Sequence, residues 1–124
     1  MATVAAAIEC KSFEHADESR SFEKGKIEWI MMSVGNIARI TLQPGWRWSE
    51  HLKPLVGTDW CESHHLQYHV SGRLHIAMQD GTEIEVGPGE VSALFSNHDA
   101  WVVGDEPVVL IDWAGVPEYA RQPE

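Results

Sequence analysis

The residues best suited to chemistry in this chain are its histidines. Seven histidines occur among 124 residues, and Cys61 lies beside the densest group of them, in the run CESHHLQYH. Neutral imidazole is a favoured ligand of zinc, iron, nickel and copper, and thiolate is a softer one. If the end of this run is a strand, its alternation places His65, Gln67 and His69 on one face. Such a row, when buried, needs a metal, water or mutual hydrogen bonds.

Other chemistries have no comparable signal. The sequence has no Ser-His-Asp arrangement, no glycine-rich phosphate loop and no CxxC pair. The net charge of −10, from 19 acidic and 9 basic residues, argues against binding to nucleic acids or anionic membranes. No apolar run approaches the roughly 20 residues that cross a bilayer, and the N-terminus does not resemble a signal peptide. With only two cysteines, a reduced, cytoplasmic protein is expected.

The elements that must position these residues are predicted to be short strands. Alternating or apolar segments are separated by glycine, proline and aspartate turns, of which Asp80-Gly81 is a strong hairpin signal. Trp46 and Trp48 are expected to share the face of a further strand, and turns are expected over 53–59. The strands are predicted at 27–34, 37–43, 64–70, 73–79, 82–86, 91–95, 101–103 and 108–113. This pattern indicates a single all-β domain, either a sandwich or a small barrel.

The segment from Gly45 to Trp113 resembles the cupin superfamily. The first cupin motif, G-x5-H-x-H-x3,4-E-x6-G, is matched at Gly45 and His51, but lysine stands at position 53 and 54–64 form an insertion. Counting back from Gly72 places His65 at the usual glutamate. The second motif is matched by Asp80-Gly81, Gly87-Pro88-Gly89-Glu90 and His98.

This resemblance implies an antiparallel double-stranded β-helix, or jelly-roll barrel, over 26–114. Residues 1–25 would then be a polar leader that could supply a strand exchanged in a dimer, and 115–124 a polar tail. Because cupins commonly dimerise, a homodimer is expected, with an apolar outward row on strand 64–70 as one contact.

The resemblance also implies a modified, histidine-rich metal site that faces the interior of the barrel. Its expected ligands are His51, His65 and His98, with Cys61, Gln67 and His69 as further candidates. The expected cofactor is a divalent transition metal: Zn, Fe, Ni, Cu or Mn. The substrate pocket is expected to include Gln67, His69, Trp48 and Arg47.

Two functions fit these expectations. The first is a metal-dependent enzyme, an oxidoreductase or an isomerase/lyase, that acts on a small oxo- or carboxyl-bearing molecule, because a metal held by neutral imidazoles keeps its full charge. The second is a non-catalytic cupin that binds or senses a small molecule, since a barrel can keep its fold while its site changes.

Overall fold

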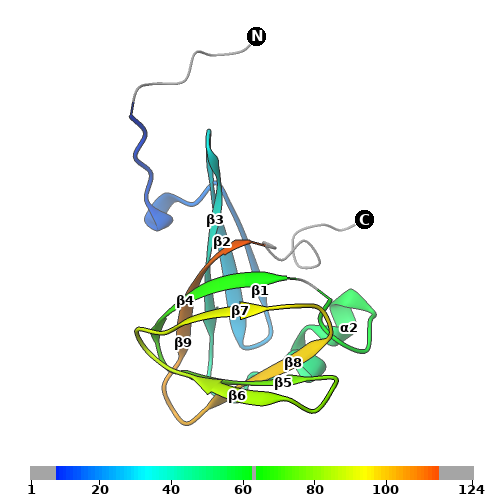
Figure 1. The fold of residues 1–124 in the computed structure, drawn as a ribbon. Helices are drawn as coiled ribbons and strands as arrows, with labels where there is room; N and C mark the ends of the chain where they lie inside the picture. The colour runs from blue at the N-terminus through cyan, green and yellow to red at the C-terminus, as the bar shows by residue number, and fades with distance from the viewer. Residues whose placement is uncertain (1–7, 63, 115–124) are drawn as a thin grey trace.

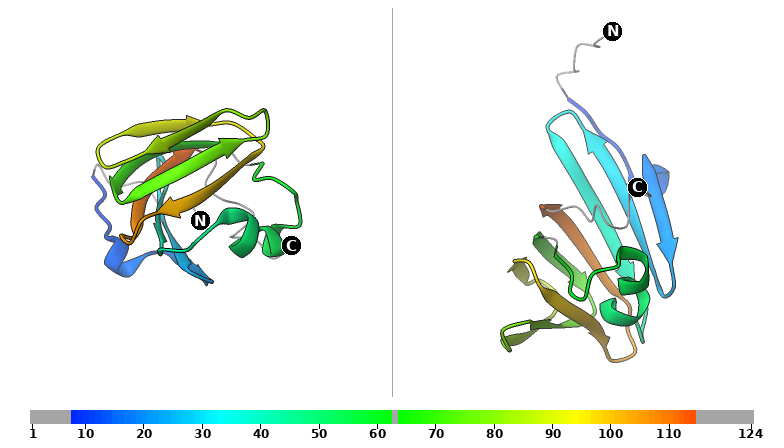
Figure 2. Two further views of the ribbon diagram at one scale, coloured as in Figure 1. Left: turned by 90° about the horizontal axis from the view of Figure 1, so that it is seen from below. Right: turned by 90° about the vertical axis from the view of Figure 1, so that its right-hand side faces the viewer.

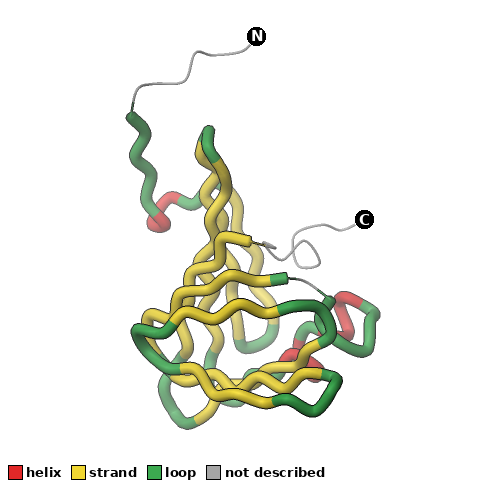
Figure 3. The backbone as a smooth tube through the Cα atoms, viewed as in Figure 1, coloured by secondary structure: helices red, strands yellow, loops and turns green. Residues whose placement is uncertain are grey.

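The computed structural model describes residues 8–62 and 64–114, and strands dominate them (Figures 1 and 3). The helical elements there are short: η1 (Phe13–His15), α1 (Trp48–His51) and α2 (Lys53–Val56). The strands are β1 (Glu18–Phe22), β2 (Gly25–Met32), β3 (Gly35–Leu42), β4 (His65–Ser71), β5 (Arg73–Met78), β6 (Glu83–Val86), β7 (Val91–Leu94), β8 (His98–Val103) and β9 (Val108–Ala114). No helix among the described residues is long and apolar enough to span a membrane.

The strands form two antiparallel sheets that face each other. The larger has the order β1-β2-β3-β9-β4-β7 and the smaller the order β6-β5-β8. Figure 2 shows that β2 and β3 extend beyond the other strands as a long hairpin. The predicted all-β barrel is therefore confirmed, and each predicted strand overlaps an observed one except the strand expected at Trp46 and Trp48.

The barrel interior is mostly apolar, and its largest row of buried polar side chains lies along β4. The core contains Trp29, Trp48, Ile76 and Leu110, all at most 2% exposed. Alternation in β4 buries three polar side chains and exposes their neighbours, as predicted for 65–69. One face of β4 is therefore buried inside the barrel, and it carries the polar row His65, Gln67 and His69.

The segment 46–59 differs from the strand and turns expected there. Trp48 begins α1 rather than sharing a strand face with Trp46, and α2 follows directly. Pro54 lies in the first turn of α2, where its missing N–H costs nothing, and Gly57 ends the helix with a left-handed φ of 86°. Helices of four residues are too short to leave a periodic pattern in the sequence.

The N-terminal residues that the structure describes lie against the outside of the long hairpin. Lys11 donates to the carbonyl of Met31 at 2.7 Å, and the guanidinium of Arg39 lies 4.9 Å from the ring centroid of Phe13. β1 pairs with β2 of its own chain and forms one edge of the large sheet. The predicted tail, 115–124, lies outside the described residues.

Candidate metal centre and pocket

Cys61, His65 and His98 meet inside the barrel. One potential ligand atom from each lies within 4.8 Å of the other two, and all three residues are buried. His65 begins β4 in the large sheet and His98 begins β8 in the small one. Cys61 reaches them because its N–H donates to the His98 carbonyl at 2.8 Å and its own carbonyl accepts the His98 N–H at 3.1 Å. The inserted segment thus returns to the barrel at this point.

Hydrogen bonds at Nδ1 fix the orientation of both imidazoles. His65 Nδ1 lies 2.6 Å from Asp112 Oδ2, and His98 Nδ1 lies 2.7 Å from the Phe95 carbonyl. Because a carboxylate and a carbonyl only accept, each Nδ1 must carry a hydrogen. Each ring therefore has only Nε2 left to act as a ligand, and His65 Nε2 lies 3.8 Å from the sulfur of Cys61.

The Cys61 thiol and the His65 imidazole shift each other's pKa. Burial raises the pKa of Cys61, but hydrogen bonds with His65 and His98 outweigh that effect and lower it to about 6. Burial likewise lowers the pKa of His65, but hydrogen bonds with Asp112 and Cys61 raise it to about 9. Both shifts favour a thiolate beside an imidazolium over the neutral pair.

This donor set fits a divalent metal. A tetrahedral Zn site with metal–nitrogen and metal–sulfur bonds of about 2.0–2.3 Å separates its ligand atoms by about 3.3–3.8 Å. The 3.8 Å between Sγ and His65 Nε2 is in that range, and the largest separation, 4.8 Å, needs side-chain movements of about 1 Å. Histidine held by a carboxylate at its second nitrogen is a common arrangement around metals, because it fixes the tautomer and increases the basicity of the ligand.

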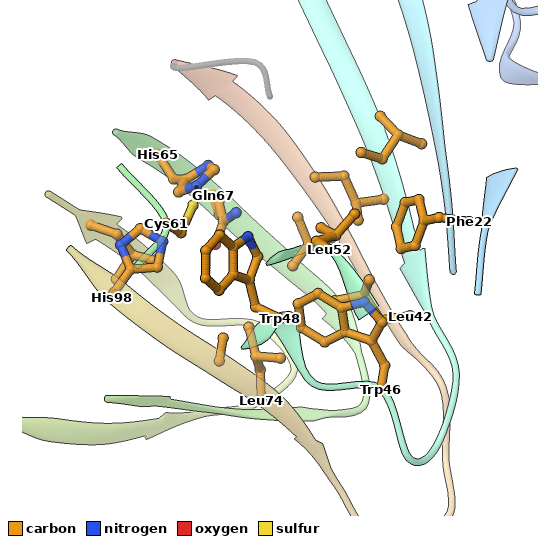
Figure 4. Close-up of a pocket in the computed structure, with 15 residues that line it drawn as sticks. Phe22, Leu42, Trp46, Trp48, Leu52, Cys61, His65, Gln67, Leu74 and His98 are labelled. Atoms are coloured by element: carbon orange, nitrogen blue, oxygen red, sulfur yellow. Dashed lines mark hydrogen bonds between the residues drawn. The ribbon is translucent and has the colours of Figure 1, made fainter. Parts of the chain in front are cut away.

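A small apolar pocket begins at these three residues (Figure 4). It has a volume of about 40 Å³, room for roughly three water molecules. In Figure 4, Trp48 stands beside the three residues, and Trp46 and Phe22 lie further along the pocket. The remaining lining is Ile27, Ile40, Leu42, Leu52, Gln67, Leu74, Leu94, Ala100 and Leu110.

The expected ligand His51 is not brought to the other two. It ends α1, where its Nδ1 accepts the Arg47 N–H at 2.9 Å and its Nε2 faces the carboxylate of Glu23 at 3.7 Å. The helical turn of 48–51 directs this side chain away from His65 and His98, and Cys61 occupies the third place.

Only some of the expected pocket residues line the pocket. Trp48 and Gln67 line the pocket. His69 is fully buried on the same wall, beyond the lining, and its Nε2 lies 3.0 Å from the Ser92 hydroxyl. Arg47 lies outside the pocket, where it stacks on Trp101 at 4.1 Å and pairs with Asp99 at 3.2 Å.

Sequence reasoning missed Asp112. This residue is fully buried and accepts from His65 and, at 3.2 Å, from the amide of Gln67. A signal was present, because Asp112 shares the inward face of β9 with Val108 and Leu110 and is the charged member of that row.

Similarity to known proteins is confined to structure. No family model and no curated protein matches the sequence. Among solved structures, a cupin-2 domain protein from Rhodospirillum rubrum superposes with a TM-score of 0.55 at 14% identity, over 76% of this chain and 61% of that chain. The protein has a cupin fold.

Two other structures share this cupin fold over more of the chain. Ectoine synthase from P. lautus has a TM-score of 0.61 at 13% identity and covers 86% of this chain and 78% of its own. A polyketide cyclase from Streptomyces resistomycificus has a TM-score of 0.60 at 14% identity, with 94% of both chains covered. At these identities the similarity concerns the fold alone.

Proposed function

We propose that this cupin binds a divalent transition metal through Cys61, His65 and His98 and acts as a metal-dependent enzyme on a small oxo- or carboxyl-bearing molecule. The observation that carries the proposal is the geometry of the two imidazoles. Both are held at Nδ1, and one potential ligand atom of each lies within 4.8 Å of the Cys61 sulfur, where the pocket begins. Softness of the thiolate favours Zn or Cu over Mn.

Three protein ligands leave a fourth coordination position open to water or substrate. Catalytic zinc sites have such an open position, whereas structural sites are filled by four protein ligands. A bound metal supplies a Lewis acid, and with Fe or Cu also redox chemistry, to a substrate at that open position. The apolar pocket that begins at these three residues is where such a substrate would bind. Oxidoreductase or isomerase/lyase chemistry is therefore proposed.

Element analysis of protein purified without a nickel column tests the metal site. We expect about one metal per chain, with loss of the metal in Cys61→Ser and His98→Ala. Cys10→Ser and His15→Ala are matched controls, because both residues are exposed, and they should keep the metal. Metal-free wild-type protein that also fails to take up added Zn²⁺, Cu²⁺ or Fe²⁺ would reject the site.

A second candidate function is non-catalytic binding or sensing of a small molecule. The composition of the pocket supports it, because among the fifteen lining residues only Cys61, His65 and His98 are groups that commonly transfer protons or bind metals. Tight binding of a small molecule without turnover, and independent of metal, would favour this alternative.

A homodimer in the cytoplasm is also proposed. Six large apolar side chains are exposed on the outer side of β4, β7 and β9, which we call the outer patch: Leu66, Tyr68, Val70, Val91, Phe95 and Trp113. Exposed apolar surface of this kind favours association with a partner. Cys10 and Cys61 are both free, which suits a reducing compartment.

A further inference from the structure

Trp48 is the bulky side chain that lies beside the proposed metal centre. In Figure 4 its indole stands next to Cys61, His65 and His98, and it forms part of the pocket wall. The residue is only 2% exposed, so the indole fills interior space. A ligand at the open coordination position must therefore use the space that Trp48 leaves.

The residues on either side of Trp48 are both tied to Asp99. Arg47 Nε donates to Asp99 Oδ2 at 3.2 Å, and the Ser49 N–H donates to Asp99 Oδ1 at 3.1 Å. Asp99 directly follows the proposed ligand His98 on β8. Moving the indole out of the pocket would break these hydrogen bonds to a buried carboxylate. The position of Trp48 relative to the metal centre is thus fixed.

The space that remains beside Trp48 is small. Its volume is about 40 Å³, whereas a dry apolar cavity that binds benzene has a volume of about 150 Å³. The other walls belong to the packed core and include Leu52, Leu74 and Leu94, all at most 6% exposed. Because protein interiors are close-packed, an added ring would have to displace these side chains.

We infer that Trp48 determines the size of the ligand at the metal centre and limits it to about three non-hydrogen atoms, the number of water molecules for which the pocket has room. The substrate is then one of the smallest carboxyl- or oxo-bearing molecules, of the size of formate, and has no ring or long chain. This inference rests on the proposed function and narrows its substrate class.

Titration of formate and benzoate into Co²⁺-loaded protein tests the size limit, because the two compounds present the same carboxylate and differ in bulk. The absorption spectrum of the Co²⁺ shows whether the carboxylate coordinates. We expect formate to bind at least about tenfold more tightly than benzoate, whose ring does not fit beside Trp48. Benzoate that binds as tightly as formate would overturn the inference, and so would formate that fails to coordinate the loaded metal.

Two matched variants assign the limit to Trp48. Trp48→Ala should bind benzoate at least about tenfold more tightly than the wild type does. Trp29→Ala removes an equally buried indole that is not part of the pocket lining, and it should keep the wild-type preference for formate. An unchanged benzoate affinity in folded Trp48→Ala protein contradicts the assignment. If an alanine variant does not fold, Trp48→Leu and Trp29→Leu replace the pair, and the order of the two compounds on wild-type protein still decides.

Failure of the metal centre gives a different result, because no Co²⁺ is then taken up. Benzene tests the size limit on metal-free protein, with the ring-proton NMR signals of His65 and His98 as reporters. Benzene should shift these signals in Trp48→Ala, where the space beside the two rings is open, but not in the wild type or Trp29→Ala. A shift in the wild type, or none in folded Trp48→Ala, would overturn the inference whether or not the protein binds a metal.

Discussion

At the scale of single residues, the His65–Asp112 pair both joins two strands and orients a candidate metal ligand. It joins the first residue of β4 to a fully buried carboxylate on β9 at 2.6 Å. A buried carboxylate without a cationic or hydrogen-bonding partner is costly, so this pair stabilises the interior only while His65 donates to it. It also determines which nitrogen of His65 is free to bind a metal.

Asp112→Asn should weaken metal binding by about 10–100-fold while the protein stays folded. The amide oxygen still accepts from Nδ1, but it increases the basicity of the imidazole less than a carboxylate does. Competition with a chelator of known affinity measures the change. Asp105→Asn, at an exposed position, is the control, and equal affinities for the two variants would contradict the role of Asp112.

Metal affinity should rise with pH. Below a pKa of about 9, His65 carries a proton on Nε2 that the metal must displace. The affinity is therefore expected to rise about tenfold per pH unit up to about pH 9, and more steeply below about pH 6, where Cys61 is also protonated. Chelator competition between pH 5 and 9 measures this. A flat profile would show that neither proton is displaced.

At the scale of elements, the sequence predicted the features that a local pattern of residues determines, namely buried strand faces and hairpin turns. The alternation in 65–69 identified the buried polar wall, and the Asp80-Gly81 turn located the β5–β6 hairpin. The spacing of the resemblance placed His51 among the ligands, but it could not show that His51 ends the helical turn α1. Nor could it show that Cys61, within the insertion 54–64, joins the histidines instead. The partner of His65 is 47 residues away, and no local pattern encodes that contact.

The turn between β4 and β5 requires glycine for a steric reason that does not apply to the turn at Gly104. Gly72 has a φ of 78°, and a Cβ there would overlap the backbone of Pro107 and Val108. Gly104 has a φ of 88° but open space around it. Gly72→Ala should destabilise the protein by at least about 2 kcal/mol more than Gly104→Ala, because only the first adds a steric clash to the backbone strain.

Chemical denaturation of the two variants measures this difference as a shift in the unfolding midpoint at constant slope. Equal losses of stability would mean that the backbone around Pro107 moves to accept a methyl group. The β4–β5 turn would then be less constrained than its packing indicates.

At the scale of the whole molecule, the proposed role of the outer patch as a dimer contact can be tested. We expect sedimentation to show a dimer at micromolar concentration. Val91→Lys should weaken the dimer by more than about tenfold, because it places a charge in an apolar contact. Val34→Lys, on the β2–β3 turn and 95% exposed, is the matched control. A wild-type protein that is monomeric at every concentration would reject the patch as a dimer contact.

The proposed metal centre would draw its ligands from three separate parts of the chain. His65 belongs to the large sheet, His98 to the small sheet and Cys61 to the inserted segment. A bound ion would therefore act as a cross-link between the two halves of the barrel, and separating the sheets would require breaking metal–ligand bonds. Loss of the ion would then speed unfolding and proteolysis as well as change activity, so the same three side chains would govern both the lifetime and the chemistry of this protein.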